Sequence, residues 1–203
     1  MTSMERAKNM RVILASGSPR RKELLAGLEI PFDVMISNID EAVRPREKPA
    51  SFALRMAFEK AMAVVNRIDG SSDVLCVIGA DTIVVLGDCI LGKPRDPEDA
   101  TRMLKMLSGN SHHVITGLCV CMRDPAGERV RGHAVHTNVV FRPITEAEIH
   151  HYVASGEPMD KAGAYAIQGG AAGMIDRIKG SYSNVVGLPM EVLTKMLKTI
   201  DAH

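Results

Sequence analysis

Aromatic residues are scarce in this sequence of 203 residues: they make up 3% of the chain, and tryptophan is absent. A core therefore has to be built from Val, Ile, Leu, Ala and the thirteen Met residues. An excess of positive charge is missing too, since the formal net charge is +1, which argues against a non-specific nucleic-acid binder. No apolar run approaches the ~20 residues of a membrane span, and the first ten residues hold no apolar segment of a secretory signal. These absences predict a cytoplasmic protein without nucleic-acid or membrane partners.

Motifs for soft metal ligands are also missing. The four cysteines, at positions 76, 89, 119 and 121, lie within or beside apolar runs, and we interpret them as buried, reduced thiols. Cys119 and Cys121 are too close for a CxxC zinc or redox motif. The seven histidines, including the pairs His112-His113 and His150-His151, follow no HExxH-like pattern. We therefore expect them in solvent or at the edge of the core rather than on a metal.

Strand-like and helix-like segments alternate along the chain, and two long strands at 114–123 and 130–141 are joined by a turn. This antiparallel pair within an alternating pattern predicts a mixed-sheet α/β fold. We expect residues 1–10 to form a poorly ordered extension and residues 11–203 a single domain. The remaining strands are expected at 11–15, 32–37, 74–86, 89–91 and 174–178. Helices are expected at 20–28, at 51–68, between Asp96 and Ser108, between Thr145 and Ser155, and after Pro189, with capping signals at several starts.

Polar and charged residues gather in three short segments that end or interrupt apolar runs: Ser16–Arg21, Gly79–Thr82 and Gly156–Gly169. The third mixes charges of both signs with an amide and several Gly and Pro residues, a mixture that a packing segment does not need. Glycine lets a backbone approach a ligand closely. The pattern predicts one polar site assembled from distant parts of the chain.

Arg20 and Arg21 fall in the first turn of the helix expected at 20–28. A helix start already favours anions, and two guanidinium groups there strengthen that preference. The alternative is a solvated pair of arginines, which would oppose the helix dipole unless an anion were near. We favour phosphate binding, although the chain has no P-loop sequence.

Asp81 lies between apolar residues in the long strand expected at 74–86. Burying a carboxylate there costs free energy unless it meets a cation or a hydrogen-bond donor. Asp81 therefore either takes part in the chemistry of the site or stabilises a neighbouring turn. The preceding Gly79 leaves space for a ligand or another backbone. Asp40, Glu41 and Glu59 are weaker candidates alone, but with Asp81 they would supply the oxygen ligands that Mg²⁺ or Mn²⁺ prefers.

Lys60, Lys93 and Lys161 each lie in a loop or at a helix position beside Gly, Pro or an acidic residue. Their placement matters more than their number, because lysines are common on any surface. Gln168 follows with an amide that donates and accepts at once, which suits the edge of a base. A solvent-exposed amide in a flexible loop is the equal alternative.

Several short blocks of the sequence together resemble those of a known family. The blocks are Ser16–Arg21, Glu59–Ala61, Gly79–Thr82, Gly92–Pro94, Asp160–Tyr165 with Ile167–Gly169, and Gly180–Pro189. With all blocks in order, the chain resembles the Maf family of nucleoside triphosphate pyrophosphatases from about Arg11 to the C-terminal helix.

The resemblance implies an elongated mixed sheet with flanking helices and two lobes around a central cleft, as in inosine triphosphate pyrophosphatases, often in a homodimer. It implies a cut between the α- and β-phosphates of a nucleoside triphosphate that depends on a divalent metal, Mg²⁺ or Mn²⁺. Asp81 is carried over as the proton acceptor. Arg20, Thr82 and Gln168 are carried over as specificity positions, and their identities look like the subfamily that hydrolyses dTTP and UTP. A non-catalytic regulator of cell division and a pyrophosphatase for a non-canonical purine nucleotide are the alternatives.

The candidate site therefore has three parts. Asp81, Lys60 and Lys93 are the expected catalytic residues. Glu41 and Asp81 are the expected metal ligands. The expected substrate-binding residues are Ser16, Arg20, Arg21, Thr82, Lys161 and Gln168.

Overall fold

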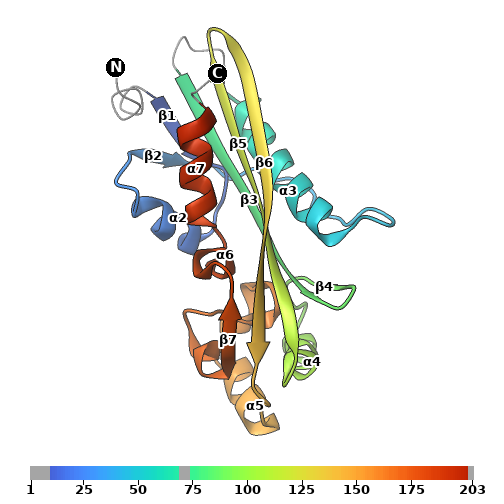
Figure 1. The fold of residues 1–203 in the computed structure, drawn as a ribbon. Helices are drawn as coiled ribbons and strands as arrows, with labels where there is room; N and C mark the ends of the chain where they lie inside the picture. Colours follow the sequence, from blue (N-terminus) through green and yellow to red (C-terminus); the bar gives the residue numbers. More distant parts are fainter. Residues whose placement is uncertain (1–9, 69–73, 201–203) are drawn as a thin grey trace. The chain divides into compact units, whose positions relative to one another are not determined.

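The computed structural model describes residues 10–68 and 74–200, so most of the expected N-terminal extension, residues 1–9, lies outside the described part (Figure 1). The strands are β1 (Met10–Leu14), β2 (Phe32–Val34), β3 (Val74–Leu86), β4 (Cys89–Leu91), β5 (Ser111–Asp124), β6 (Gly127–Phe141) and β7 (Ile175–Lys179). The α-helices are α2 (Pro19–Ala26), α3 (Pro49–Val65), α4 (Pro97–Leu107), α5 (Glu146–Ala154), α6 (Tyr182–Val186) and α7 (Met190–Ile200). Three 3₁₀ helices follow α5: η1 (Glu157–Asp160), η2 (Ala162–Ala164) and η3 (Gly170–Met174).

The strands form one seven-stranded sheet in the order β2-β1-β3-β5-β6-β7, with β4 paired to β3. β1 runs parallel to both β2 and β3, whereas the β3–β4 and β6–β7 pairs are antiparallel. The predicted mixed-sheet α/β fold with flanking helices is therefore confirmed. No helix in the described part of the chain is long and apolar enough to cross a membrane.

The chain divides into two compact units. The first comprises the residues up to Asp81 together with 116–135 and those from Gly187 onward. The second comprises residues 82–115 and 136–186. The second unit has one buried apolar cluster and the first unit has two. The expectation of a single domain for residues 11–203 stays a prediction.

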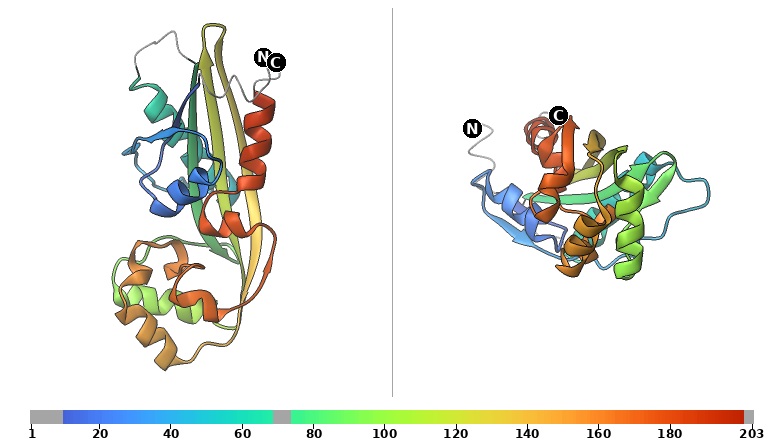
Figure 2. Two further views of the ribbon diagram at one scale, coloured as in Figure 1. Left: turned by 90° about the vertical axis from the view of Figure 1, so that its left-hand side faces the viewer. Right: turned by 90° about the horizontal axis from the view of Figure 1, so that it is seen from below.

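In the first unit the sheet is covered on both faces, which explains why its strands read as unbroken apolar runs. Alternate residues of β1, β3 and β5, such as Leu14, pack with Leu25 of α2 and Leu193 of α7. The residues between them, such as Ile13, pack with α3 residues such as Val64 on the opposite face. Figures 1 and 2 show α3 on the other side of these strands from α2 and α7. Because successive side chains of a strand point to opposite faces of the sheet, one set packs against α2 and α7 and the other set packs against α3.

Helix α3 approaches the sheet closely because glycine faces it on two strands. A Cβ added to Gly79 of β3 would lie 2.1 Å from the backbone oxygen of Ala57 and 2.9 Å from the Ala61 nitrogen. A Cβ at Gly117 of β5 would lie 2.1 Å from the Ala53 oxygen. The space that the sequence suggested at Gly79 is therefore filled by the backbone of α3.

The core of the second unit contains three mutually perpendicular rings. His112, Phe141 and Tyr165 meet edge to face, with ring centroids 4.9 to 5.4 Å apart. His112 is 1% exposed, so the expectation that the histidines lie in solvent or at the edge of the core is wrong for this residue. Burial lowers the pKa of His112 to about 4, with a smaller contribution from His113.

Several local predictions hold. Asp96 caps α4 by accepting a hydrogen bond from the Asp99 nitrogen at 2.7 Å, and Thr145 and Glu148 form the expected capping box of α5. All four cysteines are free thiols, but Cys89 is exposed, so its predicted burial is wrong: it lies in a three-residue strand directly after a tight turn. Helix α6 and the three 3₁₀ helices were not predicted.

Candidate functional site

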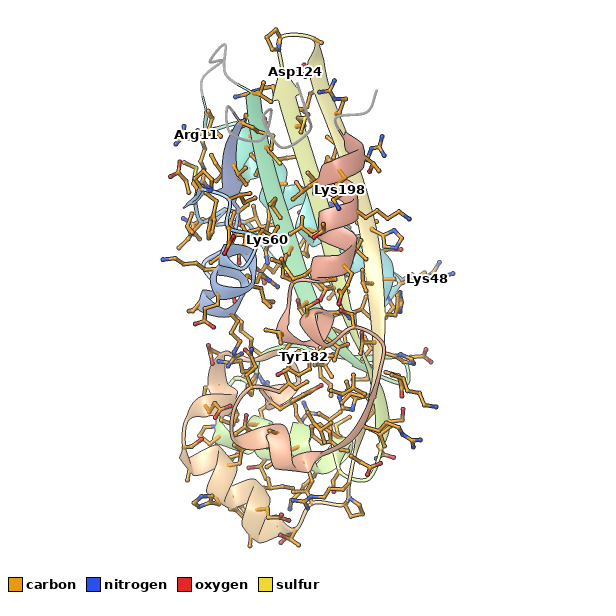
Figure 3. The ribbon with its side chains drawn as sticks, turned by 60° about the vertical axis from the view of Figure 1, so that its left-hand side comes forward. Arg11, Lys48, Lys60, Asp124, Tyr182 and Lys198 are labelled. Carbon is orange, nitrogen blue, oxygen red and sulfur yellow. The ribbon has the colours of Figure 1, made fainter. Side chains whose placement is uncertain are left out.

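The centre of the candidate site in the first unit is Lys60, which α3 carries toward β3 (Figure 3). Its ammonium nitrogen lies 2.6 Å from Oδ1 of Asp81 and 2.7 Å from Oε1 of Glu41. Lys60 and Asp81 are 8% and 7% exposed, whereas the Glu41 side chain is 54% exposed. The close approach at Gly79 brings α3 near enough for this contact. Asp81 thus meets the cation that its apolar surroundings require.

The loop that carries Glu41 is tied to the same helix. Arg55 of α3 donates to both carboxylate oxygens of Glu47 at 2.6 Å and to the backbone oxygen of Ala42 at 3.0 Å. The hydrogen bonds from Arg55 lower the pKa of Glu47 to about 2. Glu59, one of the weaker metal candidates, bonds to Arg44 and Arg55 at 3.1 and 3.2 Å and so belongs to this support. The network holds Glu41 and Lys60 in one region of the unit.

Ser16 and Arg21 are brought together at the start of α2. Nη1 of Arg21 donates to Oγ of Ser16 at 3.1 Å, and Nε donates to the backbone oxygen of Gly187 at 2.8 Å. Burial lowers the pKa of Arg21, and the carboxylates of Asp81 and Glu41 oppose that shift. Arg21 therefore supports the local structure while lying in the field of the two acids.

Arg20 differs from its neighbour. Its side chain makes no hydrogen bond or ion pair with any residue in the ranges 10–68 and 74–200, and it is partly exposed. Ser18 caps the helix by accepting a weak hydrogen bond from the Arg21 nitrogen at 3.5 Å. Arg20 thus offers a cation at a capped helix start, which is the arrangement that anions favour.

The second unit holds the other predicted residues. The segments that carry Lys93 and Lys161 are bonded directly, since the Gly163 nitrogen donates to the Gly92 oxygen at 3.0 Å. Lys93 is exposed and bonds to no residue in the described ranges, whereas Lys161 pairs with the neighbouring Asp160. Thr82 follows Asp81 directly on β3 and is partly buried.

Gln168 is presented on the surface of the second unit. Residues 163–167 are all buried, yet Gln168 is exposed, and its side chain bonds to none of the residues that the structure describes. The Gly169 nitrogen donates to the Ala166 oxygen at 3.2 Å, which closes a tight turn around Gln168. The amide is therefore available to a ligand.

Glu41 and Asp81 were expected to hold a divalent metal, and their chemistry fits a shared site. One oxygen of each carboxylate lies within 2.7 Å of the same Lys60 nitrogen, so the two acids converge. Mg²⁺ is commonly held by one or two carboxylates, with waters and substrate phosphates completing its shell. No cluster of three or more His, Cys, Asp or Glu side chains among residues 10–68 and 74–200 is arranged to hold a metal. The pair fits a cation whose coordination shell is completed by the substrate, and not a site formed by protein ligands alone.

Sequence reasoning missed the residues that support the site. Arg55 and Glu47 lie eight positions apart across a helix start, and neither stands in a recognisable motif. Tyr152 and Glu157 bond to the segment that carries Gln168, and His112 bonds to Tyr165 at 2.8 Å. The only signal in the sequence was the position of Glu157 inside the Gly156–Gly169 segment.

These features define an α/β protein with an ammonium held between two carboxylates, a cation at a helix start and an exposed amide on a glycine-rich turn. Residues 11–200 match the family described as "Maf-like protein". The chain therefore belongs to the Maf-like family.

Relatives over nearly the full length support this assignment. The chain is 53% identical over 195 residues to a protein of Geobacter metallireducens named "dTTP/UTP pyrophosphatase", covering 96% of this chain and 98% of the other. It is 54% identical over 192 residues to a protein of the same name from Geobacter sulfurreducens, covering 95% and 97%. A solved dITP/XTP pyrophosphatase from Mycobacterium abscessus matches 64% of this chain and 73% of its own, with a TM-score of 0.32 and 16% identity, a likeness too slight to bear on the fold.

Proposed function

We propose that this protein hydrolyses dTTP and UTP to the nucleoside monophosphate and pyrophosphate. The observation that carries the proposal is the Lys60 ammonium held by Asp81 and Glu41, at 2.6 and 2.7 Å, in a member of the Maf-like family. The relatives named dTTP/UTP pyrophosphatase, at 53% and 54% identity, support this substrate class.

In this reaction Asp81 accepts the proton of the attacking water. The water oxygen forms a bond to the α-phosphorus, the bond between that phosphorus and the oxygen bridging to the β-phosphate breaks, and pyrophosphate leaves with the electron pair. Lys60 holds Asp81 in place through its 2.6 Å contact. General-base catalysis of this kind typically contributes ~10²–10⁴ in rate.

Glu41 and Asp81 are the residues that would hold Mg²⁺ or Mn²⁺. When bound there, such a cation neutralises charge on the phosphates and lowers the pKa of the attacking water. Arg20, Arg21 and Ser16 would bind phosphate oxygens at the start of α2, because charged donors at a helix start favour anions.

Gln168, in the second unit, is the residue proposed to read the base. The amide of Gln168 pairs with the edge of thymine or uracil, where N3–H donates and the flanking carbonyls accept. Cytosine lacks that N3–H, so the same amide faces a mismatched partner. Lys93 belongs to the catalytic set, Lys161 binds substrate, and Thr82 contributes to specificity.

The cellular setting forms part of the same proposal. The four free cysteines fit a reducing compartment, the cytoplasm. A homodimer is expected, and nucleic acid and membranes are not expected as partners.

The position of the cut can be tested with water enriched in ¹⁸O. Wild-type protein, Mg²⁺ and dTTP should yield dTMP and pyrophosphate, with the label in dTMP. Release of orthophosphate, or label found in pyrophosphate, would contradict attack at the α-phosphorus. Binding of dTTP without turnover at saturating Mg²⁺ or Mn²⁺ would instead support a non-catalytic regulator. Asp81→Asn is the control for contaminating activity.

A further inference from the structure

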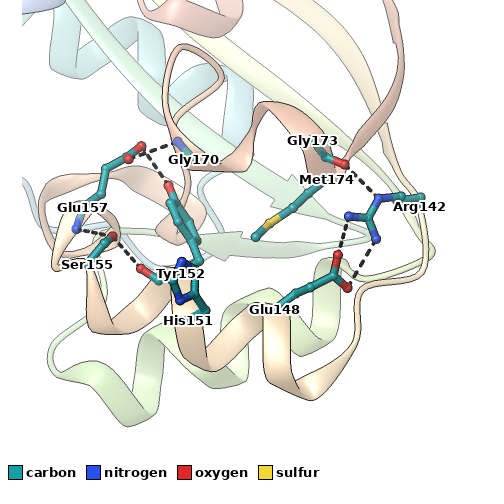
Figure 4. A pocket seen from close by; sticks show the side chains of 9 residues that line it. All are labelled: Arg142, Glu148, His151, Tyr152, Ser155, Glu157, Gly170, Gly173 and Met174. Atoms are coloured by element: carbon teal, nitrogen blue, oxygen red, sulfur yellow. Dashed lines mark hydrogen bonds and ion pairs between the residues drawn. The ribbon is translucent and has the colours of Figure 1, made fainter.

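A pocket in the second unit borders the segment that carries Gln168 (Figure 4). It encloses about 310 Å³. At one wall Arg142 donates to Glu148 at 2.5 Å and to the backbone oxygen of Gly173 at 2.8 Å. At the other wall stand Tyr152 and Glu157, and their bonds lead toward Gln168.

These bonds form a continuous chain on both sides of Gln168. The Ala166 nitrogen donates to Oη of Tyr152 at 3.1 Å. That hydroxyl donates to Oε1 of Glu157 at 3.1 Å, and Oε2 of the same carboxylate accepts from the Gly170 nitrogen at 3.1 Å. Ala166 and Gly170 lie two residues before and two residues after Gln168. One tyrosine and one carboxylate therefore hold both ends of the turn that presents the amide.

The fit of Glu157 against this turn is tight. A Cβ added to Gly169 would lie 1.8 Å from Oε1 and 2.4 Å from the carboxyl carbon of Glu157. The carboxylate thus lies directly against the backbone of the residue that follows Gln168, in addition to accepting the hydrogen bond from the Gly170 nitrogen.

Tyr165 holds the segment that carries Gln168 in the core of the second unit. Tyr165 is 6% exposed, and its hydroxyl lies 2.8 Å from Nε2 of His112. Ile167 is 7% exposed, so the residues that precede Gln168 are fixed in the core while Gln168 itself points outward. A backbone held in this way fixes the position from which the Gln168 side chain extends before a ligand arrives, and such preorganisation favours selective polar recognition.

We propose that Tyr152 and Glu157 are positioning residues that fix Gln168 for recognition of the pyrimidine base. The inference rests on the proposed function of Gln168 and extends it to residues that do not touch the substrate. Loosening the turn should weaken the productive contact with thymine, while the phosphate chemistry in the first unit continues.

The test uses Tyr152→Phe and Glu157→Gln, each of which keeps the size of the side chain. Tyr152→Phe removes the hydroxyl that links Ala166 to Glu157. Glu157→Gln replaces one acceptor oxygen with an amide donor. The matched controls are Tyr182→Phe, on a half-exposed ring (Figure 3), and Glu148→Gln, on the other wall of the same pocket. Thermal midpoints of all variants are measured, and kinetics are run below the lowest of them.

The readout is the ratio of kcat/KM for dTTP to that for CTP. Both test variants should lower this ratio about 3- to 10-fold, through a higher KM for dTTP with kcat within about twofold of wild type. Both controls should leave the ratio unchanged. Unchanged ratios in both test variants, or an equal fall in Glu148→Gln, would overturn the positioning role.

A double variant tests the positioning role of Tyr152 separately from base reading by Gln168. If Tyr152 acts through Gln168, then Tyr152→Phe combined with Gln168→Ala has the same ratio as Gln168→Ala alone. Additive losses would show that Tyr152 acts by another route and would overturn the inference, while base reading by Gln168 would stand. If Gln168→Ala alone leaves the ratio at the wild-type value, base reading by Gln168 fails and the inference fails with it.

Discussion

Lys60 connects two acids that are otherwise separate in the sequence. Asp81 is held in an apolar strand at 7% exposure, and Glu41 lies on a largely exposed loop. The shared ammonium brings a buried carboxylate and an accessible one to one point, at 2.6 and 2.7 Å. A buried carboxylate beside an accessible one is the arrangement that the proposed activation of a water molecule by Asp81 requires.

Replacement of Asp81 by Asn keeps the size and shape of the side chain but removes the proposed proton acceptor. We expect turnover of dTTP to fall by ~10²–10⁴, with the fold retained by circular dichroism. Near-normal turnover at saturating metal would remove Asp81 from its catalytic role.

The two neighbouring arginines should behave differently. Arg20 bonds to no residue in the described ranges, so Arg20→Ala should raise KM for dTTP about tenfold without lowering the thermal midpoint, and should make KM less sensitive to salt. Arg21→Ala should raise KM as well, but it should also destabilise the fold, because Arg21 holds Ser16 and Gly187. A KM for Arg20→Ala that matches wild type across a salt series would identify Arg20 as an ordinary solvated residue.

His112 predicts a pH dependence of stability. Its folded pKa is lowered from 6.5 to about 4, mainly by burial, so the unfolded chain binds more protons between these values. The stabilising contribution is therefore complete above about pH 6.5 and is lost as the pH falls to about 4. Between pH 7 and 4, wild type should lose roughly 3 kcal/mol more unfolding free energy than His112→Gln.

Urea unfolding of both proteins at pH 7 and pH 4 measures that difference. The side chains that face the histidine in the core are Phe141 and Tyr165, and His113 adds a small repulsion. Equal losses in wild type and His112→Gln would show that the imidazole titrates normally in the folded protein.

At the scale of elements, the packing of α3 on the sheet decides where Lys60 lies. Gly79→Ala would place a Cβ 2.1 Å from a backbone oxygen of α3, which cannot be relieved by a side-chain rotation. We expect a loss of about 1–3 kcal/mol in unfolding free energy and a fall in activity, because the helix that carries Lys60 must shift.

Gly173→Ala is the matched control, since nothing lies within 4 Å of the Cβ that it would add. It should leave stability within about 0.5 kcal/mol of wild type. The close-packing account would be contradicted if Gly79→Ala and Gly173→Ala unfolded at the same denaturant concentration.

Elements with strong local signals were predictable from the sequence. The long runs of β3 and β5 and the caps at Asp96 and Thr145 depend on residues within a few positions of each other. The 3₁₀ helices were missed because contacts from elsewhere shape them. In η2, for example, Gly163 has φ of +67°, and a Cβ there would lie 2.8 Å from Val84.

At the scale of the whole molecule, the candidate residues of the first unit alone come from segments far apart in the sequence, from Ser16 to Gly187. Sequence motifs identified Asp81, Lys60 and Glu41, and the structure places them together. They could not show that Arg21 is engaged by Ser16 and Gly187, because those contacts join segments up to 166 positions apart. The support of Gln168 by Tyr152 and Glu157 was hidden for a similar reason, since it depends on how the chain turns back after α5.

The proposed function is selective hydrolysis of pyrimidine triphosphates whose base carries N3–H. The most direct measurement is pyrophosphate release by wild-type protein from dTTP, UTP, CTP and GTP, compared as kcat/KM under one metal concentration. An unpaired buried polar group costs roughly 1–3 kcal/mol, so dTTP and UTP should exceed CTP and GTP by about tenfold or more. Hydrolysis of CTP or GTP as efficient as that of dTTP would contradict the claim.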